Sequence, residues 1–346
     1  MKILGLISSL TDPASRLRVM QYEPWFKKKG ETLDHKLFVP LRDTDPAPWS
    51  YTLKKITGLN EWRSSNFIKT LGRTPLLFSQ FGYDLIWQNR LLQLRNFFWE
   101  KKIRKPVIFD FDDAIWMYEG EKQVIQKLQI SDMLFAGNEY LANFAIKHNK
   151  NIHIIPTTID TKKIFPLYKQ TEQFTIGWIG TKSNFQYLEM IRMPLMDFLA
   201  SDNNARLMII SSELPGFLKA DNKQIIFKPW APETENELIN EFSVGIMPLD
   251  DTEWTRGKCS FKFLQYLACA KPAIVSPVGM NNKILSEAEV GIAANSPDEW
   301  LSALLKIKND PAMAQSFGTA GQKLVEEKYS CNLWTEIIIT HMKTIV

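Results

Sequence analysis

Two stretches of the chain begin in the same way, with a short apolar run that leads through a small turn into a helix start. Residues 2–8 are mainly apolar and are followed by Asp12 and Pro13, which suit the N-cap and the first position of a helix. Residues 174–180 repeat this pattern and end on Gly180. Because strands that alternate with helices pair in parallel, each half is predicted to form a doubly wound parallel sheet.

The length of the chain favours two such α/β domains over one. A chain of 346 residues exceeds the usual size of a single hydrophobic core. The polar, proline-interrupted stretch 161–172 separates the halves and is expected to be a hinge. We therefore expect a first domain over 1–165, a second over 172–330, and a last helix over 331–346.

The other elements follow from the same patterns. In the first half, apolar runs predict strands at 36–39, 83–88 and 106–111, a last strand that begins near Asn151, and a helix over 89–102. In the second half they predict strands at 206–211, 225–228, 244–248 and 273–276, and helices at 297–307, 311–328 and 332–345.

The strongest sign of a binding site lies at the start of one short helix. Ser260 is a suitable N-cap, so this helix is expected to begin at Phe261, and Arg256, Lys258 and Lys262 then crowd its first turn. Cations there oppose the helix dipole unless an anion lies among them, and the unpaired N–H groups of the turn would help to hold it. A solvated basic turn is the plainer interpretation, but three cations before a buried strand favour a phosphate site.

This segment resembles the nucleotide-sugar-binding signature of GT-B glycosyltransferases, especially the group 1 (family 4-like) enzymes. The matching residues are Lys262, Gln265, Tyr266, Leu267, Ala268, Pro272, Ile274, Val275 and Ser276. The family often carries two glutamates eight positions apart, where this chain has Gly257 and Gln265. Gln265 could still hydrogen-bond a ribose hydroxyl as a neutral amide.

The resemblance implies two Rossmann-like domains that face a central cleft, with the last helix returning toward the first domain. A nucleoside-diphosphate sugar would lie on the second domain, where cations stabilise the leaving diphosphate, so no metal or cofactor is expected. The resemblance, and not the residues themselves, implies that the anomeric configuration is retained. Lys258 is the expected catalytic residue. The expected donor-binding residues are Gly180, Lys182, Glu253, Trp254, Arg256, Ser260, Lys262 and Gln265. For Glu253 or Trp254 taken singly, an ordinary exposed loop is slightly the better interpretation.

An acidic motif follows the strand expected at 106–111 in the first half. Asp110, Asp112 and Asp113 lie at the carboxyl end of that strand, where α/β proteins bind ligands. One interpretation is an Asp-x-Asp metal site of a GT-A enzyme, but the second strand start at residue 174 favours GT-B. We expect Asp112 and Asp113 to contact the acceptor or the transferred sugar, with either as a candidate general base. Helix capping and ion pairs to Arg16, Arg18 or Arg90 are the alternative.

Two arginines near the first helix start are candidates for an anionic ligand. Arg16 and Arg18 follow the first strand and could meet an acceptor or donor phosphate, or lie on the surface. Residues 1–170 contain 26 Lys and Arg against 17 Asp and Glu, while the rest has 16 against 21. A basic first half suits an acidic partner such as anionic lipid or a polyprenyl-diphosphate-linked acceptor.

The cysteine content of the chain fits a reducing, cytoplasmic setting. Its three cysteines form no CxxC pair, and no run is long and apolar enough to span a bilayer. Lysines beside aromatic residues at 25–29 and 97–105 suit a peripheral contact with the inner face of the plasma membrane. They equally suit solvated helix ends over buried rings. No motif indicates nucleic acid.

The sequence thus predicts a hexosyltransferase-type glycosyltransferase that acts in cell-surface polysaccharide synthesis on a glycan or lipid-linked acceptor. A non-catalytic GT-B-like protein that binds a glycan or serves as a scaffold is the alternative, and the pair Gly257 and Gln265 is its best support. A sugar-nucleotide epimerase on the same fold would need catalytic acids and a histidine that the sequence does not place.

Overall fold

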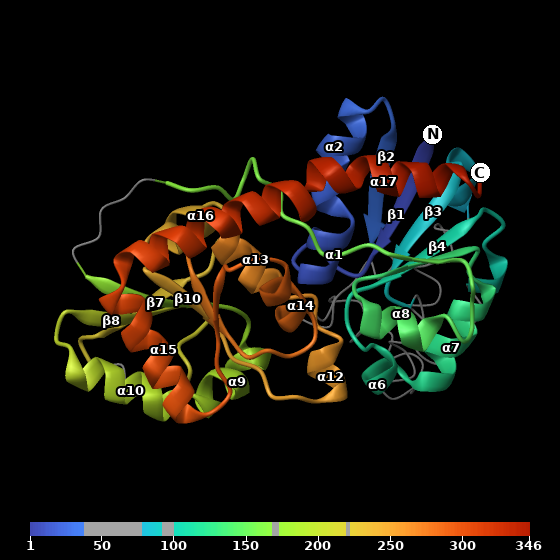
Figure 1. Cartoon of the computed structure of the whole chain (residues 1–346). Coiled ribbons are helices and arrows are strands. Elements are labelled where there is room, and N and C mark those ends of the chain that lie inside the picture. Colours follow the sequence, from blue (N-terminus) through green and yellow to red (C-terminus); the bar gives the residue numbers. More distant parts are fainter. Residues whose placement is uncertain (38–77, 92–99, 168–172, 219–221) are drawn as a thin grey trace, which may run out of the picture. The chain divides into compact units, whose positions relative to one another are not determined.

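The computed structural model describes residues 1–37, 78–91, 100–167, 173–218 and 222–346 (Figure 1). The chain divides into two compact units. The first is Met1–Ile155 together with Thr335–Val346, and the second is Pro156–Trp334. The division falls at residue 155, earlier than the hinge expected at 161–172.

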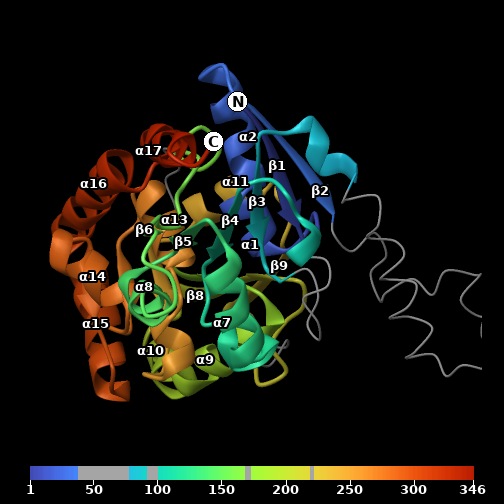
Figure 2. The same cartoon turned by 90° about the vertical axis from the view of Figure 1, so that its right-hand side faces the viewer.

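The first unit contains a six-stranded parallel sheet in the order β2-β1-β3-β4-β5-β6. Its strands are β1 Lys2–Ile7, β2 Thr32–Leu37, β3 Leu85–Asn89, β4 Val107–Phe111, β5 Met133–Ala136 and β6 Ile152–Ile154. Its helices are α1 Pro13–Arg18, α2 Glu23–Lys28, α6 Trp116–Glu119, α7 Glu121–Ile130 and α8 Glu139–Ala145. The strands β1 and β2 run side by side in both Figure 1 and Figure 2.

The second unit contains another six-stranded parallel sheet, in the order β12-β11-β10-β7-β8-β9. Its strands are β7 Phe174–Ile179, β8 Ala205–Ser211, β9 Ile225–Pro229, β10 Val244–Met247, β11 Ala273–Val275 and β12 Gly291–Ala293. Its helices are α9 Phe185–Met190, α10 Arg192–Ser201, α11 Glu235–Asn240, α12 Glu253–Arg256, α13 Phe261–Ala268, α14 Met280–Glu287, α15 Pro297–Asn309 and α16 Pro311–Lys328.

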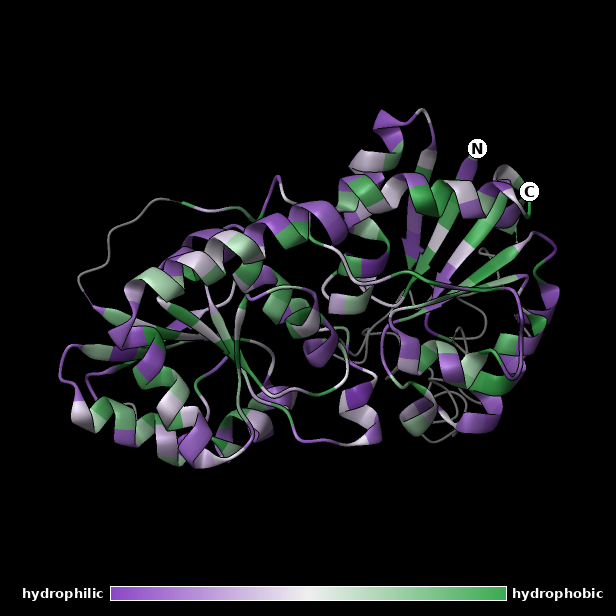
Figure 3. Cartoon of the chain, viewed as in Figure 1, coloured by the Kyte–Doolittle hydropathy of each residue, from purple (hydrophilic) through white to green (hydrophobic). Residues whose placement is uncertain are grey.

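Two apolar cores cover the two faces of the second sheet. On β7 and β10, Trp178 and Ile246 join the core that includes residues of α10 and α15, while Ile179 and Met247 join the core that includes residues of α13 and α14. This division follows from the period-two alternation of side chains along a strand. In Figure 3 green stretches follow the strands, and purple collects on the outer turns of the helices.

The sheet order puts the point where the winding of the second sheet reverses between β7 and β10. The chain moves outward from β7 to β8 and β9 on one side, and from β10 to β11 and β12 on the other. Ligands of open α/β sheets bind at the carboxyl ends of the strands beside such a point. The carboxyl ends of β7 and β10 are therefore the expected place of a binding site.

The helix α17, Cys331–Lys343, ends in the first unit. Glu336 pairs with Lys29, and Lys343 pairs with Glu31 at 2.9 Å. The ring of His341 stacks on that of His153 with 3.7 Å between centroids. No described helix is both long enough and apolar enough to cross a membrane.

Several sequence expectations need correction in detail. The second strand begins at Thr32 rather than at residue 36, and β5 and β12 were not expected at all. The helix expected over 89–102 includes Asn89, which ends β3, while 92–99 lie outside the described residues. The short strands were missed because four or fewer apolar residues do not establish a period.

The lysine–aromatic clusters differ in what the structure describes of them. Trp25 and Phe26 are buried, and the Lys28 ammonium lies 4.2 Å from the centroid of the Trp25 ring. This arrangement matches a helix end over buried rings. The second cluster lies partly outside the described residues, because 97–99 are not among them.

Candidate functional site

The candidate site of the second unit is built where β7, β10 and β11 end. Gly180 follows β7, the segment with α12 and α13 follows β10, and residues 276–279 follow β11. These segments meet in space: a Cβ on Gly180 would lie 2.8 Å from Cε of Lys262, and a Cβ on Gly279 would lie 2.8 Å from the carbonyl oxygen of Arg256. Glycine is required at both positions by this close approach, and at Gly279 also by a φ of 53°.

Two of the predicted cations are half-buried over aromatic rings. The Lys258 ammonium lies 5.1 Å from the ring centroid of Trp254 and 5.8 Å from that of Tyr187. The Lys262 ammonium lies 5.8 Å from the ring centroid of Trp178. Ring faces attract a cation, so these contacts help to hold both ammonium groups in place at the start of α13.

The other two predicted cations have carboxylate partners at the surface. Lys182 pairs with Glu213 at 2.7 Å, and Arg256 pairs with Asp251 through two contacts of 2.6 and 3.0 Å. Exposed pairs of this kind contribute little stability, so a stronger anion could replace the carboxylate. Glu253 is exposed on α12, whereas Trp254 is half-buried against Lys258.

Ser260 precedes α13 as predicted, but it does not cap the helix with its side chain. Its backbone is left-handed, with a φ of 56°, and its hydroxyl donates to Oδ1 of Asn281 at 2.6 Å. Asn281 in turn donates to the carbonyl of Ser276 at 3.0 Å. The hydroxyl therefore ties the start of α13 to the loop after β11, so Ser260 contributes by holding the loop rather than by the predicted capping.

Gln265 occupies the position of a family glutamate in the middle of α13. Its side chain is 2% exposed, and its Nε2 atom is buried without a hydrogen-bond partner among the described residues. Such an amide is costly to leave unpaired, since a buried donor that gives up water without a replacement loses about 1–3 kcal/mol. The buried amide of Gln265 would therefore be stabilised by a hydrogen-bond acceptor.

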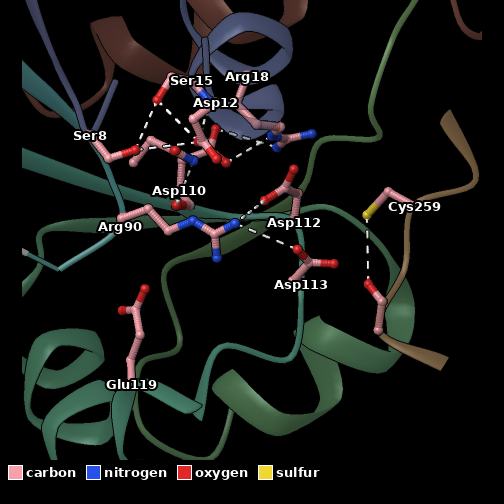
Figure 4. A network of polar contacts seen from close by, with 12 residues as sticks. Ser8, Asp12, Ser15, Arg18, Arg90, Asp110, Asp112, Asp113, Glu119 and Cys259 are labelled. Carbon is pink, nitrogen blue, oxygen red and sulfur yellow. Dashed lines mark hydrogen bonds and ion pairs between the residues drawn. The ribbon is translucent and has the colours of Figure 1, made fainter. Parts of the chain in front are cut away.

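A second polar network lies at the carboxyl ends of β3 and β4 in the first unit (Figure 4). Asp110 is fully buried and receives Nε of Arg18 at 2.8 Å and Nε1 of Trp87 at 2.9 Å. Arg18 also donates to the carbonyl of Ile155 at 2.7 Å. The expectation that Arg18 meets a phosphate does not fit this burial, because its guanidinium joins three segments of the first unit. Arg16 lies half-buried on α1.

The two aspartates chosen from the sequence lie beside Arg90. Nη2 of Arg90 is 3.5 Å from Oδ2 of Asp113 and 4.0 Å from Oδ1 of Asp112. The side chain of Asp112 is 14% exposed, and that of Asp113 is 24% exposed. Arg90 has a φ of 77°, a conformation that is strained in a residue other than glycine and that recurs at functional sites. Asp110 pairs with Arg18 and Asp113 pairs with Arg90, which are ion pairs that the alternative interpretation expected.

Two further carboxylates belong to this network: Asp12, which was expected as the N-cap of α1, and Glu119, which the sequence did not single out. Asp12 caps α1 by accepting the N–H of Ser15 at 3.1 Å and the hydroxyl of Ser8 at 3.3 Å. Glu119 accepts the N–H of Leu91 at 3.4 Å, and burial raises its pKa to about 7 against the opposing charge of Arg90. Glu119 lay at the end of a four-residue helix with no motif around it, so no local signal could have marked it.

No three His, Cys, Asp or Glu side chains converge as metal ligands in the described part of the chain. In the Asp-x-Asp motif, Asp110 pairs with Arg18 inside the unit, and Asp112 lies beside Arg90.

Comparison with solved structures identifies the fold of the protein. Sucrose-phosphate synthase from Thermosynechococcus elongatus superposes with a TM-score of 0.72 at 14% identity, covering 100% of both chains. HepE of Anabaena, solved in complex with UDP and glucose, superposes with a TM-score of 0.68 at 11% identity over 99% of each chain. A glycosyltransferase from Rickettsia africae has a TM-score of 0.68 at 11% identity, over 99% of this chain and 98% of that one. The fold is GT-B.

Residues 173–310 match the family model of glycosyl transferases group 1. The matched residues include α13, where the sequence resembles the signature of the same family, and the fold of the chain is GT-B. None of the curated proteins matches it.

Proposed function

We propose that the chain transfers a sugar from a nucleoside-diphosphate sugar to a hydroxyl group of a glycan or lipid-linked acceptor. The observation that carries this proposal is the placement of Lys258 and Lys262 over aromatic rings at the start of α13. They lie beside the reversal point of a sheet that belongs to a group 1 domain. HepE, with the same fold, was solved with UDP-glucose.

In this proposal the second unit binds the donor. Lys258 and Lys262 hold the diphosphate and stabilise the negative charge that grows on it as the sugar leaves. Gln265 donates its amide to a ribose or phosphate oxygen, which satisfies a group that is otherwise orphaned. Lys182 and Arg256 exchange their carboxylate partners for phosphate oxygens. Because these cations supply the charge, transfer needs no metal ion or cofactor.

The first unit holds the acceptor in this proposal. Asp112 and Asp113 accept hydrogen bonds from sugar hydroxyls, and either takes the proton of the attacking hydroxyl. The carboxylates of Asp12, Asp112, Asp113 and Glu119 outnumber the guanidinium of Arg90 at this edge, which favours neutral hydroxyls there over phosphate. An acceptor diphosphate would instead lie near Arg16. Retention of configuration and a role in cell-surface polysaccharide synthesis complete the proposal on the family resemblance. A cytoplasmic, membrane-peripheral location is proposed from the cysteine pattern and the lysine–aromatic clusters.

A non-catalytic role as a glycan-binding or scaffold protein is the second candidate. Gly257 and Gln265 replace the two glutamates common in the family, and this observation favours it. Turnover or hydrolysis of any sugar nucleotide excludes this candidate.

The first test is a thermal-shift screen against UDP, GDP, ADP, dTDP, CMP and their sugars, in the presence of EDTA. We expect one nucleotide to stabilise the wild type, by about 2.7 kcal/mol at a hundredfold excess over its Kd, because only the folded state binds it. Lys258→Ala should lose this shift, and its kcat should fall by about 10²–10³ if Lys258 stabilises the transition state.

Lys323→Ala is the matched control, since Lys323 is an exposed lysine on α16 that pairs with Glu327. It should shift like the wild type. If no nucleotide stabilises the folded wild-type protein, the proposed enzyme activity fails and the non-catalytic role stands. A shift and turnover that Lys258→Ala retains would remove Lys258 from the active site.

A further inference from the structure

The strands β7 and β10 pair only near their amino ends. The register joins Val244 to Ile176 and Gly245 to Gly177, and no further pair is formed. One more step would join Ile246 to Trp178, and the parallel pattern would then direct the N–H of Ile179 at the carbonyl of Ile246. The ladder stops at the reversal point of the sheet, directly below the candidate donor site.

The hydroxyl of Tyr266 occupies the place of the missing ladder bond. It accepts the N–H of Ile179 at 3.3 Å and donates to the carbonyl of Ile246 at 3.2 Å. Tyr266 is fully buried, and burial raises the pKa of its phenol well above the ordinary value, so the group stays protonated and able to donate. One side chain thus satisfies both backbone groups while keeping the strand ends apart.

The sheet is shaped to admit this ring. A Cβ on Gly245 would lie 2.3 Å from the Tyr266 ring, so only glycine leaves room for it on β10. The ring of Phe242 packs edge-on against Tyr266 with 5.8 Å between centroids. These contacts hold the phenol in one orientation.

Tyr266 and Lys262 lie four residues apart on α13, and therefore on the same face of the helix. Lys262 packs against the end of β7 one residue beyond the inserted hydroxyl: its Cε touches the position of a Gly180 Cβ, and its ammonium lies over Trp178. A single helix face therefore both separates β7 from β10 and places a cation over the end of β7.

We propose that Tyr266 is a positioning residue for donor binding: its hydroxyl, inserted between β7 and β10, sets the place of the Lys262 ammonium. The proposal rests on the proposed function only in assigning Lys262 to the donor diphosphate. Removing the hydroxyl lets the Ile179 N–H close on the Ile246 carbonyl, or leaves both groups unpaired. In either case β7 and the face of α13 shift relative to each other.

The test is Tyr266→Phe, which keeps the ring and removes the hydroxyl. Calorimetric binding of UDP, or of whichever nucleotide the screen selects, should weaken about tenfold, the effect of one lost buried hydrogen-bonding arrangement. Tyr329→Phe is the matched control, because it also removes one buried tyrosine hydroxyl of the second unit, bonded to Glu287 at 3.0 Å. This control should lose similar thermal stability and keep its affinity.

A double-mutant cycle separates positioning from general destabilisation. If Tyr266 acts through Lys262, then Tyr266→Phe should weaken binding less than about twofold in a Lys262→Met background, because contacting residues couple whereas independent ones add. Equal losses in both backgrounds overturn the proposal, as does a Tyr266→Phe protein with wild-type affinity.

If the wild type binds none of the nucleotides, the proposed function is overturned. The positioning role of Tyr266 is then tested by a crystal structure of Tyr266→Phe. There we expect a direct Ile179–Ile246 hydrogen bond and a Lys262 ammonium displaced from the Trp178 ring. An unchanged Lys262 would overturn the inference without any ligand.

Discussion

At the scale of the residue, three aspartates of one motif have different surroundings. Asp110 points into the first unit, where burial raises its pKa to about 6 while Arg18 and Trp87 oppose the rise. Asp112 and Asp113 lie beyond the end of β4 and stay partly exposed. The sequence favoured Asp112 and Asp113 over Asp110 as ligand contacts, and the burial of Asp110 is compatible with that choice.

Glu119 gives a pH-dependent prediction. Its folded-state pKa of about 7 lies above the unfolded value of 4.5, so the folded state binds the extra proton and stability falls as the pH rises between these values. Glu119→Gln mimics the protonated acid, keeps an acceptor for the Leu91 N–H, and should unfold with a free energy about 1–2 kcal/mol higher at pH 8.

Urea unfolding of Glu119→Gln at pH 8 and at pH 4 checks this. The difference from wild type should vanish at pH 4, where both side chains are neutral. Glu121→Gln, at an exposed position in α7, is the control and should show no such pH dependence. A destabilised Glu119→Gln at pH 8 would mean that the ionised carboxylate is stabilised by Arg90 more than burial disfavours it.

At the scale of the element, α13 holds the site because both of its ends are fixed. Ser260 ties the first turn to Asn281, and the last turn ends in a Schellman motif: Lys271 N–H donates to Tyr266 at 2.9 Å and Ala270 N–H to Leu267 at 2.9 Å. Glycine usually fills the left-handed position of this motif, whereas here Ala270 has a φ of 52°. The backbone at this helix end is thus strained at Ala270.

Ala270→Gly should therefore raise the free energy of unfolding by about 0.5–1 kcal/mol, the left-handed cost of alanine less the added freedom of glycine in the unfolded chain. Chemical denaturation measures it. Ala320→Gly, inside the long helix α16, is the control and should lower stability by about 1 kcal/mol, because glycine is a poor helix former at an ordinary helical φ. A loss of stability in Ala270→Gly would show that the methyl group contributes more than the strain costs.

At the scale of the whole molecule, α17 links the two units through one continuous helix. Its first residues belong to the second unit and the stretch from Thr335 onward to the first. In the first unit, the ring of His341 on α17 stacks on that of His153. The centroid of the Phe135 ring lies 6.5 Å from that of His341. Burial lowers the pKa of both histidines, and for His153 the charge of His341 lowers it further.

Acid should therefore loosen the end of α17. The folded pKa values lie below the unfolded value of about 6.5, so the stability that the neutral pair contributes is present above that pH and is lost as the pH falls through the folded pKa values. Hydrogen exchange of residues 335–343, corrected for intrinsic rates, should show falling protection between about pH 7 and pH 5.

His341→Phe keeps a ring on His153 and removes one of the two charges, so protection should persist further into acid. His148→Phe is the control and should behave like the wild type, because the ring of His148 packs at a tilt against Phe144 and not against His153. Equal acid loss in wild type and His341→Phe would place the sensitive groups elsewhere.

What the sequence by itself determined are the features that depend on neighbours along the chain. The apolar runs that became β1, β4, β7 and β8 were found within a residue or two, Asp12 caps α1 as expected, and the cations near α13 were located from helix-start chemistry alone. The GT-B class followed from the alternation of strands and helices and from the signature around Gln265.

Only the tertiary structure decided what each polar side chain does, because its partners come from distant parts of the chain. Arg18 meets Asp110 across 92 positions, and Tyr266 meets Ile179 across 87. Ser260 was predicted to cap its own helix and instead bonds to Asn281. Local propensity selects strand or helix at each segment, but sheet order brings the strand ends together, and that meeting determines which charges are buried and which remain at the candidate site.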